Sequence, residues 1–187
     1  MTRDSQTKTA TVREGASRDK GRQRLSSPSG IGEQGVAEIA GCLNALLADA
    51  FALYIKTKNF HWHVSGPHFR DYHLLFDEQA AQILAITDDI AERVRKLGTT
   101  TVRSIRDIAK LQRVLDNDAD CVEAEAMLLE LCEDNKTLTN RMREAKEVCD
   151  SHQDVATSAM IDVWVDEAER RAWFLFESAR TGSSSEG

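Results

Sequence analysis

The sequence is poor both in residues that break helices and in patterns that build strands. It has two prolines in 187 residues, and aromatic side chains make up 6% of it. No stretch alternates apolar and polar residues as a half-buried strand does. Long runs of alanine, leucine, glutamate and arginine, all good helix formers, occupy the chain instead. We therefore expect an all-α protein, long enough for one domain with a substantial core.

The sequence also lacks features of membrane and secreted proteins. No uninterrupted apolar run reaches the length that spans a membrane, and the best of them, Ala45 to Ile55, contains Asp49. The N-terminus lacks the apolar core of a signal peptide. No two cysteines form a CxxC pair, and all four fall in helical patterns, so they are expected to be reduced and buried, as in a cytoplasmic protein. They are Cys42, Cys121, Cys132 and Cys149.

Both ends of the chain differ from its middle. Residues 1–31 are rich in serine, threonine, glycine and arginine and nearly free of large apolar side chains, which predicts a disordered arm. This arm carries seven basic residues and three acids, a net charge of +4, whereas the whole chain carries −7, so the remainder carries −11. A basic arm can bind DNA phosphates without reading sequence; a solubilising tail that binds nothing is the alternative. Residues 182–187 are expected to be a flexible tail.

The middle of the chain, residues 32–181, predicts a four-helix bundle with one long crossover. Apolar residues recur at the helical spacing i, i+3, i+4 in four long stretches and one short one. The short stretch lies in the middle connection. The stretches are Gly35 to about His61, Pro67 to Gly98, Ile105 to Leu115, about Asp118 to Val148, and Val155 to about Arg180. The segment Ser151 to Asp154 resembles a helix start with a capping acid.

One predicted helix presents metal-binding side chains on a single face. With about 100° per residue and His73 as zero, Asp77 falls near 40°, Asp88 near 60° and Glu92 near 100°. One chain cannot bring all four to one ion, because Asp77 and Asp88 are roughly 16 Å apart along the axis and metal–ligand bonds are about 2 Å. Solvated residues on an ordinary amphipathic helix are the alternative interpretation.

The spacing of these residues is symmetric, which suggests how a site can form. The midpoint of residues 73 and 92 is also that of 77 and 88, between Gln82 and Ile83. If two copies of the helix pack antiparallel about a two-fold axis there, His73 faces Glu92 of the other copy and Asp77 faces Asp88. Such a contact makes two identical sites at once. This predicts a metal site shared between chains.

His61 adds a fifth candidate ligand. It continues the apolar stripe of the first long helix, so it points toward the core; a satisfied core histidine is the alternative. A shell of carboxylates and imidazoles suits iron, manganese or zinc better than calcium. No histidine follows a glutamate by three residues, so the Glu-x-x-His motif of a di-iron site inside one bundle is missing. His63 and His68 lie on other faces or in the turn and stay unassigned.

The run NFHWHVSGPHFRDYHLLFDE, followed by TDDIAERVRKLG, closely resembles the Dps family (DNA-binding protein from starved cells), the mini-ferritins. The resemblance covers roughly residues 35–180, and its motif is specific: HW, G-x-x-F, H-x-x-x-D and D-x-x-x-E-R. It implies a ferritin-like bundle and a hollow homododecamer. It also implies ferroxidase activity at paired iron ions between two-fold-related subunits, hydrogen peroxide as the usual oxidant, and storage of ferric mineral inside the shell.

Carried over by motif, the resemblance implies that His61, His73 and Asp77 come from one subunit and Asp88 and Glu92 from its neighbour. Trp62 is similar to the family's tryptophan thought to take up stray oxidising equivalents; a packing aromatic is the alternative. Acidic pores near the start of the last helix make Asp150 and Asp154 candidates, and Asp162 a weaker one. Ser158 and Ala159 stand where the family often has another acid.

The function expected from the sequence is iron storage and detoxification in the cytoplasm, without contact to membranes. Sequence-independent DNA binding through the arm would associate the protein with the nucleoid. A structural DNA-compacting protein whose metal site is vestigial or serves assembly is the competing interpretation. A helical adaptor without metal is a third.

Overall fold

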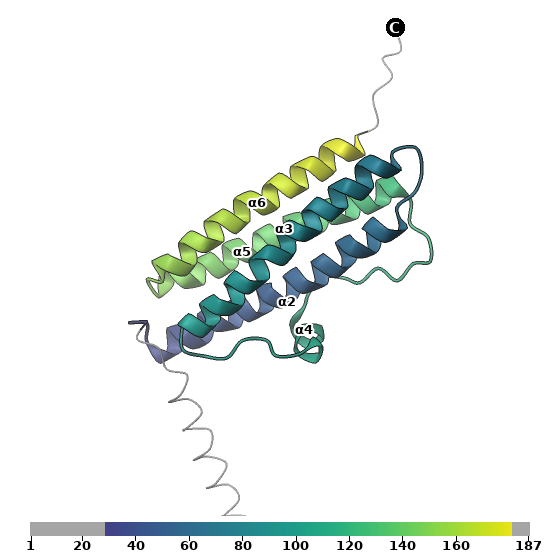
Figure 1. The fold of residues 1–187 in the computed structure, drawn as a ribbon. Helices are drawn as coiled ribbons and strands as arrows, with labels where there is room; N and C mark the ends of the chain where they lie inside the picture. Colours follow the sequence, from purple (N-terminus) through teal and green to yellow (C-terminus); the bar gives the residue numbers. More distant parts are fainter. Residues whose placement is uncertain (1–28, 181–187) are drawn as a thin grey trace, which may run out of the picture.

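Residues 29–180 form a bundle of four long helices (Figure 1). The computed structural model describes residues 29–180, and every regular element in that range is an α-helix. The long helices are α2 (Glu33–His63), α3 (Phe69–Lys96), α5 (Ala124–Ser151) and α6 (Val155–Ala179). The short α4 (Ile105–Leu111) lies in the long connection between α3 and α5 and packs against α2. The predicted all-α bundle with a short helix in its middle crossover is therefore confirmed. The predicted arm, apart from its last three residues, and the predicted tail lie outside the described residues.

Turn residues and caps divide the long helices into two pairs, α2 with α3 and α5 with α6. Gly66, with φ of +109°, lies in the turn between α2 and α3, and Gly98, with φ of +89°, follows Leu97, the C-cap of α3. Both adopt a left-handed conformation that glycine enters without a steric penalty. Asp154 is the N-cap of α6 and accepts a hydrogen bond from the Thr157 amide at 3.1 Å. Ser151, predicted to open this helix start, is instead the last residue of α5.

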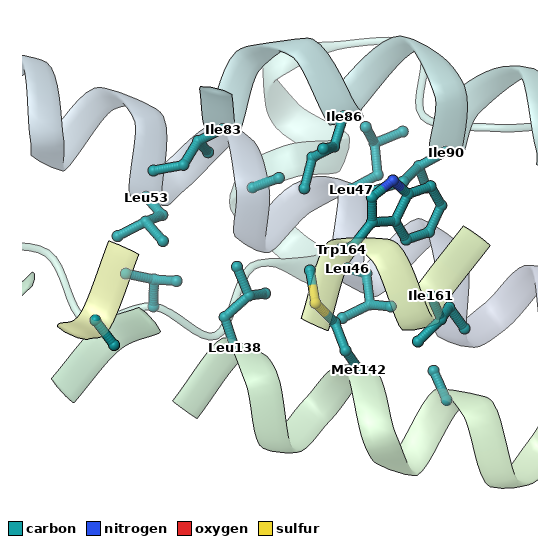
Figure 2. Packing of buried hydrophobic residues seen from close by; sticks show 14 of the residues in the cluster. Leu46, Leu47, Leu53, Ile83, Ile86, Ile90, Leu138, Met142, Ile161 and Trp164 are labelled. Carbon is teal, nitrogen blue, oxygen red and sulfur yellow. The ribbon is translucent and has the colours of Figure 1, made fainter. Parts of the chain in front are cut away.

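One apolar core fills the space between the four long helices, as Figure 2 shows. Each long helix contributes side chains that are at most 4% exposed. They include Leu46, Leu47 and Leu53 of α2, Ile83, Ile86 and Ile90 of α3, Leu138 and Met142 of α5, and Ile161 and Trp164 of α6. The apolar stripes found in the sequence therefore face one another, which leaves the outer face of α3 free to carry polar groups.

Helix α2 is the one helix of residues 29–180 that is long and apolar enough to cross a membrane. Half of its most apolar window is buried in the bundle, and a core helix passes the same test. Asp49, near its centre, is fully buried. It accepts hydrogen bonds from Arg113 Nη2 at 2.6 Å and faces Arg141 Nη1 at 3.3 Å. These contacts tie α2 to α5 and to the connection that follows α4.

Two predicted helix boundaries were wrong, both in that connection. Helix α4 ends at Leu111, not Leu115, because the amide of Arg113 donates to Asp49 Oδ1 at 2.6 Å and leaves the helical path. Helix α5 begins at Ala124, not near Asp118. The side chain of Asn117 accepts a hydrogen bond from the Ala119 amide at 3.1 Å, so this segment forms a turn instead.

One cysteine in this connection, Cys121, was wrongly predicted to be buried. Cys121 is exposed, because its segment is not helical, whereas Cys132 and Cys149 are buried and Cys42 is half-buried. None of the four forms a disulfide within the described chain. Burial raises the pKa of the Cys149 thiol to about 12, so this thiol stays protonated at neutral pH and is chemically inert.

Candidate metal centre

Two histidines lie against each other where α2 ends and α3 begins. The rings of His61 and His73 stack with their centroids 3.8 Å apart. His61 Nδ1 lies 2.8 Å from the backbone oxygen of His73, and His73 Nδ1 lies 2.9 Å from the backbone oxygen of His61. A carbonyl oxygen can only accept, so each Nδ1 carries the proton and donates it. In the neutral form of each ring, Nε2 is then the nitrogen with a free lone pair, the form that binds a metal.

Asp77, one helical turn beyond His73, completes a group of three potential ligands. Its Oδ1 lies 3.9 Å from His61 Nε2, and its side chain is 57% exposed. The hydrogen bond and the positive charge of Lys58 hold the pKa of the Asp77 carboxyl below its ordinary value of 3.8. This carboxylate is therefore charged at neutral pH. The structure thus brings together three of the five predicted ligands, which we call the histidine half-site.

The other two predicted ligands lie further along α3 and do not join the histidine half-site within one chain. Asp88 and Glu92 are exposed, and Glu92 forms an ion pair with Lys96 at 3.2 Å. We call this pair the acidic half-site. Among residues 29–180 no cluster of three or more His, Cys, Asp or Glu side chains is arranged to hold a metal ion alone. The site shared by two chains therefore remains a prediction.

Lys58 is a residue of this site that the sequence reasoning missed. Its Nζ lies 2.7 Å from Asp77 Oδ1, and its side chain is only 17% exposed. The same ammonium lies 5.8 Å from the centre of the Trp62 ring, within the range of a cation–π contact. Lys58 precedes His61 by three residues and therefore shares its helix face. That spacing was the available signal, but a lysine is not a usual metal ligand.

Trp62 extends outward beside the histidine half-site. Its side chain is 61% exposed, so it is not a core aromatic of its own chain. His63 Nδ1 lies 2.8 Å from the backbone oxygen of Asn59, and His68 stands at the start of α3, with its ring 5.7 Å from that of Tyr72. Neither histidine joins the half-site, and both stay unassigned.

The acids proposed for a pore fall into two groups. Asp154 is only 3% exposed, and its carboxylate accepts a hydrogen bond from Arg93 Nη2 at 2.6 Å. It is a structural cap and is not available to line a pore, which corrects that prediction. Asp150 and Asp162 are exposed and lie 4.0 and 3.1 Å from Lys146 Nζ, which partly neutralises them.

The model of the ferritin-like domain family matches residues 41–181. An uncharacterized low temperature-induced protein from Nostoc sp. is 34% identical, over 76% of this chain and 78% of its own. A DNA protection during starvation protein from Brevibacillus brevis is 31% identical, over 73% of this chain and 91% of its own.

Solved structures agree with these sequence matches. DpsC from Streptomyces coelicolor has a TM-score of 0.80 at 27% identity, over 83% of this chain and 91% of its own. A Dps homologue from the archaeon Halobacterium salinarum has a TM-score of 0.80 at 26% identity, over 86% of this chain and 89% of its own. The family match over residues 41–181 includes both half-sites and all of the long helices except the start of α2.

Proposed function

The chain belongs to the Dps family of ferritin-like proteins, and on that premise we propose that it oxidises Fe(II) at sites between two-fold-related subunits and stores the ferric product. The observation that carries this proposal is the pair of basic Nε2 atoms, on His61 and His73, beside the Asp77 carboxylate. In this proposal the acidic half-site of the neighbouring subunit, Asp88 and Glu92, completes each site. A homododecameric shell provides the two-fold contacts.

The reaction balances with hydrogen peroxide as the oxidant. Two Fe(II) ions each give one electron, and one peroxide with two protons becomes two waters. Delivering both electrons together avoids the one-electron step that releases hydroxyl radical. Carboxylates from both half-sites attract Fe(II), and their negative charge favours the higher charge of Fe(III). Trp62, exposed next to the ligand His61, is placed to take up oxidising equivalents that escape the paired ions.

The net negative charge of the helical part of the chain also supports the proposal, because it attracts iron cations from a distance. Residues beyond the arm carry a net charge of −11, so the shell attracts cations toward its surface and interior. Lys58 opposes this locally, because its ammonium occupies one oxygen of Asp77. Iron that binds at Asp77 therefore competes with Lys58 for the charge of this carboxylate.

Removal of the acidic half-site tests the proposal. The double variant Asp88→Ala/Glu92→Ala should lose peroxide-driven Fe(II) oxidation while the shell still assembles, as followed by absorbance of the ferric product and by native mass. The neighbouring Asp89→Ala is the matched control, since Asp89 is also exposed on α3 but lies about 60° outside the arc of the four ligands. A double variant that keeps the wild-type rate would refute the proposed site.

DNA compaction is a second candidate function, favoured by the opposite charges of the arm and the body. Protection of DNA is named in relatives such as the Brevibacillus brevis protein. Twelve basic arms on one shell would bind DNA together far better than one arm alone, in the cytoplasm at the nucleoid. Deleting residues 1–31 should abolish gel shifts of DNA, and wild-type binding should weaken steeply with salt. If the deleted form loses DNA binding but keeps iron oxidation, the two functions are separable.

A further inference from the structure

Helices α3, α5 and α6 meet at a buried layer of polar side chains. Arg171 of α6 is only 1% exposed, and its Nε donates to Asn135 Oδ1 of α5 at 2.9 Å. The amide of Asn135 in turn donates to the backbone oxygen of Leu131 at 2.8 Å. Gln79 of α3 is 3% exposed, and its Nε2 donates to the backbone oxygen of Arg171 at 3.2 Å. The layer therefore links three helices through one arginine.

Three polar atoms of this layer lack a hydrogen-bond partner among the described residues. They are Nη1 and Nη2 of Arg171 and Oε1 of Gln79. Burial lowers the pKa of the Arg171 guanidinium to about 10, so it still carries its charge at neutral pH. Nearly all buried polar groups in folded proteins are hydrogen-bonded, and an unpartnered buried cation is strongly unfavourable. These atoms therefore call for a partner.

A small cavity between α3 and α6 provides the space. Arg171 and Gln79 both line it, and its volume is about 10 Å³. A cavity of this size is at the lower limit for one water molecule. Glu78, Arg170 and Phe174 also line it and are exposed on the surface. A molecule from solvent can therefore reach the cavity without unfolding the bundle.

We propose that this cavity is a binding site for one small hydroxylic molecule, with water as its occupant, held between Arg171 and Gln79. The unpartnered atoms of Arg171 and Gln79 require a ligand that both accepts and donates hydrogen bonds. Arg171 offers only N–H donors, so the ligand must accept. Gln79 offers an acceptor, because its Nε2 is already engaged by the Arg171 backbone, so the ligand must also donate. A halide ion can accept from Arg171 but cannot donate to Gln79.

A crystal structure of the assembled full-length protein tests the occupant directly. One ordered water is expected within hydrogen-bond distance of both an Arg171 Nη atom and Gln79 Oε1. Crystals grown in bromide separate the alternative, because an anomalous peak at this position would identify an anion and overturn the proposal. Direct pairing of the guanidinium with Glu78 or Glu167 would overturn it as well.

A double-mutant cycle tests the bridge in solution. The direct hydrogen bond from Gln79 goes to the backbone oxygen of residue 171, which Arg171→Met retains. Energetic coupling between the two side chains beyond that of shared packing should therefore pass through the bound molecule. The fall in melting temperature caused by Gln79→Met should be smaller when Arg171→Met is already present.

The matched control is Gln82→Met, which alters the same cavity wall. The Gln82 amide donates to Glu78 at 3.1 Å and not to residue 171. Its effect should therefore add independently to that of Arg171→Met. Additive shifts for Gln79→Met as well would contradict a bridging ligand. If a variant fails to assemble, the density in the wild-type crystal alone decides the question.

Discussion

Subunit complementation gives the sharpest test of a metal site shared between chains. One variant, His73→Ala/Asp77→Ala, loses the histidine half-site. The other, Asp88→Ala/Glu92→Ala, loses the acidic half-site. Each variant alone has no complete site. In a mixed two-fold pair, however, the first variant supplies an intact acidic half-site and the second an intact histidine half-site, so one of the two sites is restored.

The expected activity follows from counting. If equal amounts of both variants assemble at random, half of the pairs are mixed, and half of the sites in each mixed pair are complete, so about one quarter of wild-type sites are recovered. Both variants would be unfolded together and reassembled, and Fe(II) oxidation with peroxide would be measured per subunit. Shells that are assembled separately and then mixed serve as the control and should show no recovery.

The same experiment can refute the reasoning. If the co-assembled shells stay as inactive as the separate variants, the two half-sites do not meet across a two-fold axis. Activity in either variant alone would show that one half-site suffices. Recovery near one quarter excludes a site contained in one chain, because every chain in the mixture carries a defect.

Other predictions concern Asp49, Lys58 and the cysteines. Asp49→Ala removes a fully buried carboxylate that accepts three hydrogen bonds from Arg113 and should cost about 3 kcal/mol of stability, or roughly 6–12 °C in melting temperature, as measured by calorimetry; an unchanged midpoint would contradict this. Lys58→Met removes the cation that competes for Asp77 and should raise Zn(II) affinity in titration calorimetry, by at most about fivefold because Asp77 is largely exposed; an unchanged or weaker affinity would contradict it. Iodoacetamide at pH 8 should alkylate exposed Cys121 well before buried Cys149, as read by mass spectrometry. Because the folded pKa of Cys149 is raised from 9.0 to about 12, its contribution to stability should decline as pH rises from about 9 towards 12.

The helical architecture could be predicted because the signals for it are local. Apolar spacing defined the four long helices, and Gly98 and Asp154 marked ends that the structure confirms. The connection after α4 could not be predicted in the same way. Its path depends on Asp49, a buried acid 64 residues before Arg113 in the sequence. Long-range ion pairs of this kind leave no periodic pattern.

In the candidate site, too, the local geometry could be predicted from the sequence, whereas the long-range contacts could not. Helical geometry put Asp77 next to His73, and the apolar stripe directed His61 inward; the structure brings these three together. The exchange of hydrogen bonds between the two histidines and the opposite backbone oxygens depends on the shape of the turn at Gly66, which spacing alone does not give. Arg171 occupies a core position of α6, yet an arginine is normally interpreted as a surface residue. Its burial became visible only in three dimensions.

The two stacked histidines have a consequence for how a shell matures. Their ring orientation is set by neighbouring peptide groups of one polypeptide, so this portion of the centre is preformed in a lone monomer. If the two half-sites meet as proposed, docking of a second subunit would add Asp88 and Glu92 to this preformed part and so strengthen metal binding. By linkage, metal bound at such a shared site would favour docking as much as docking favours metal binding.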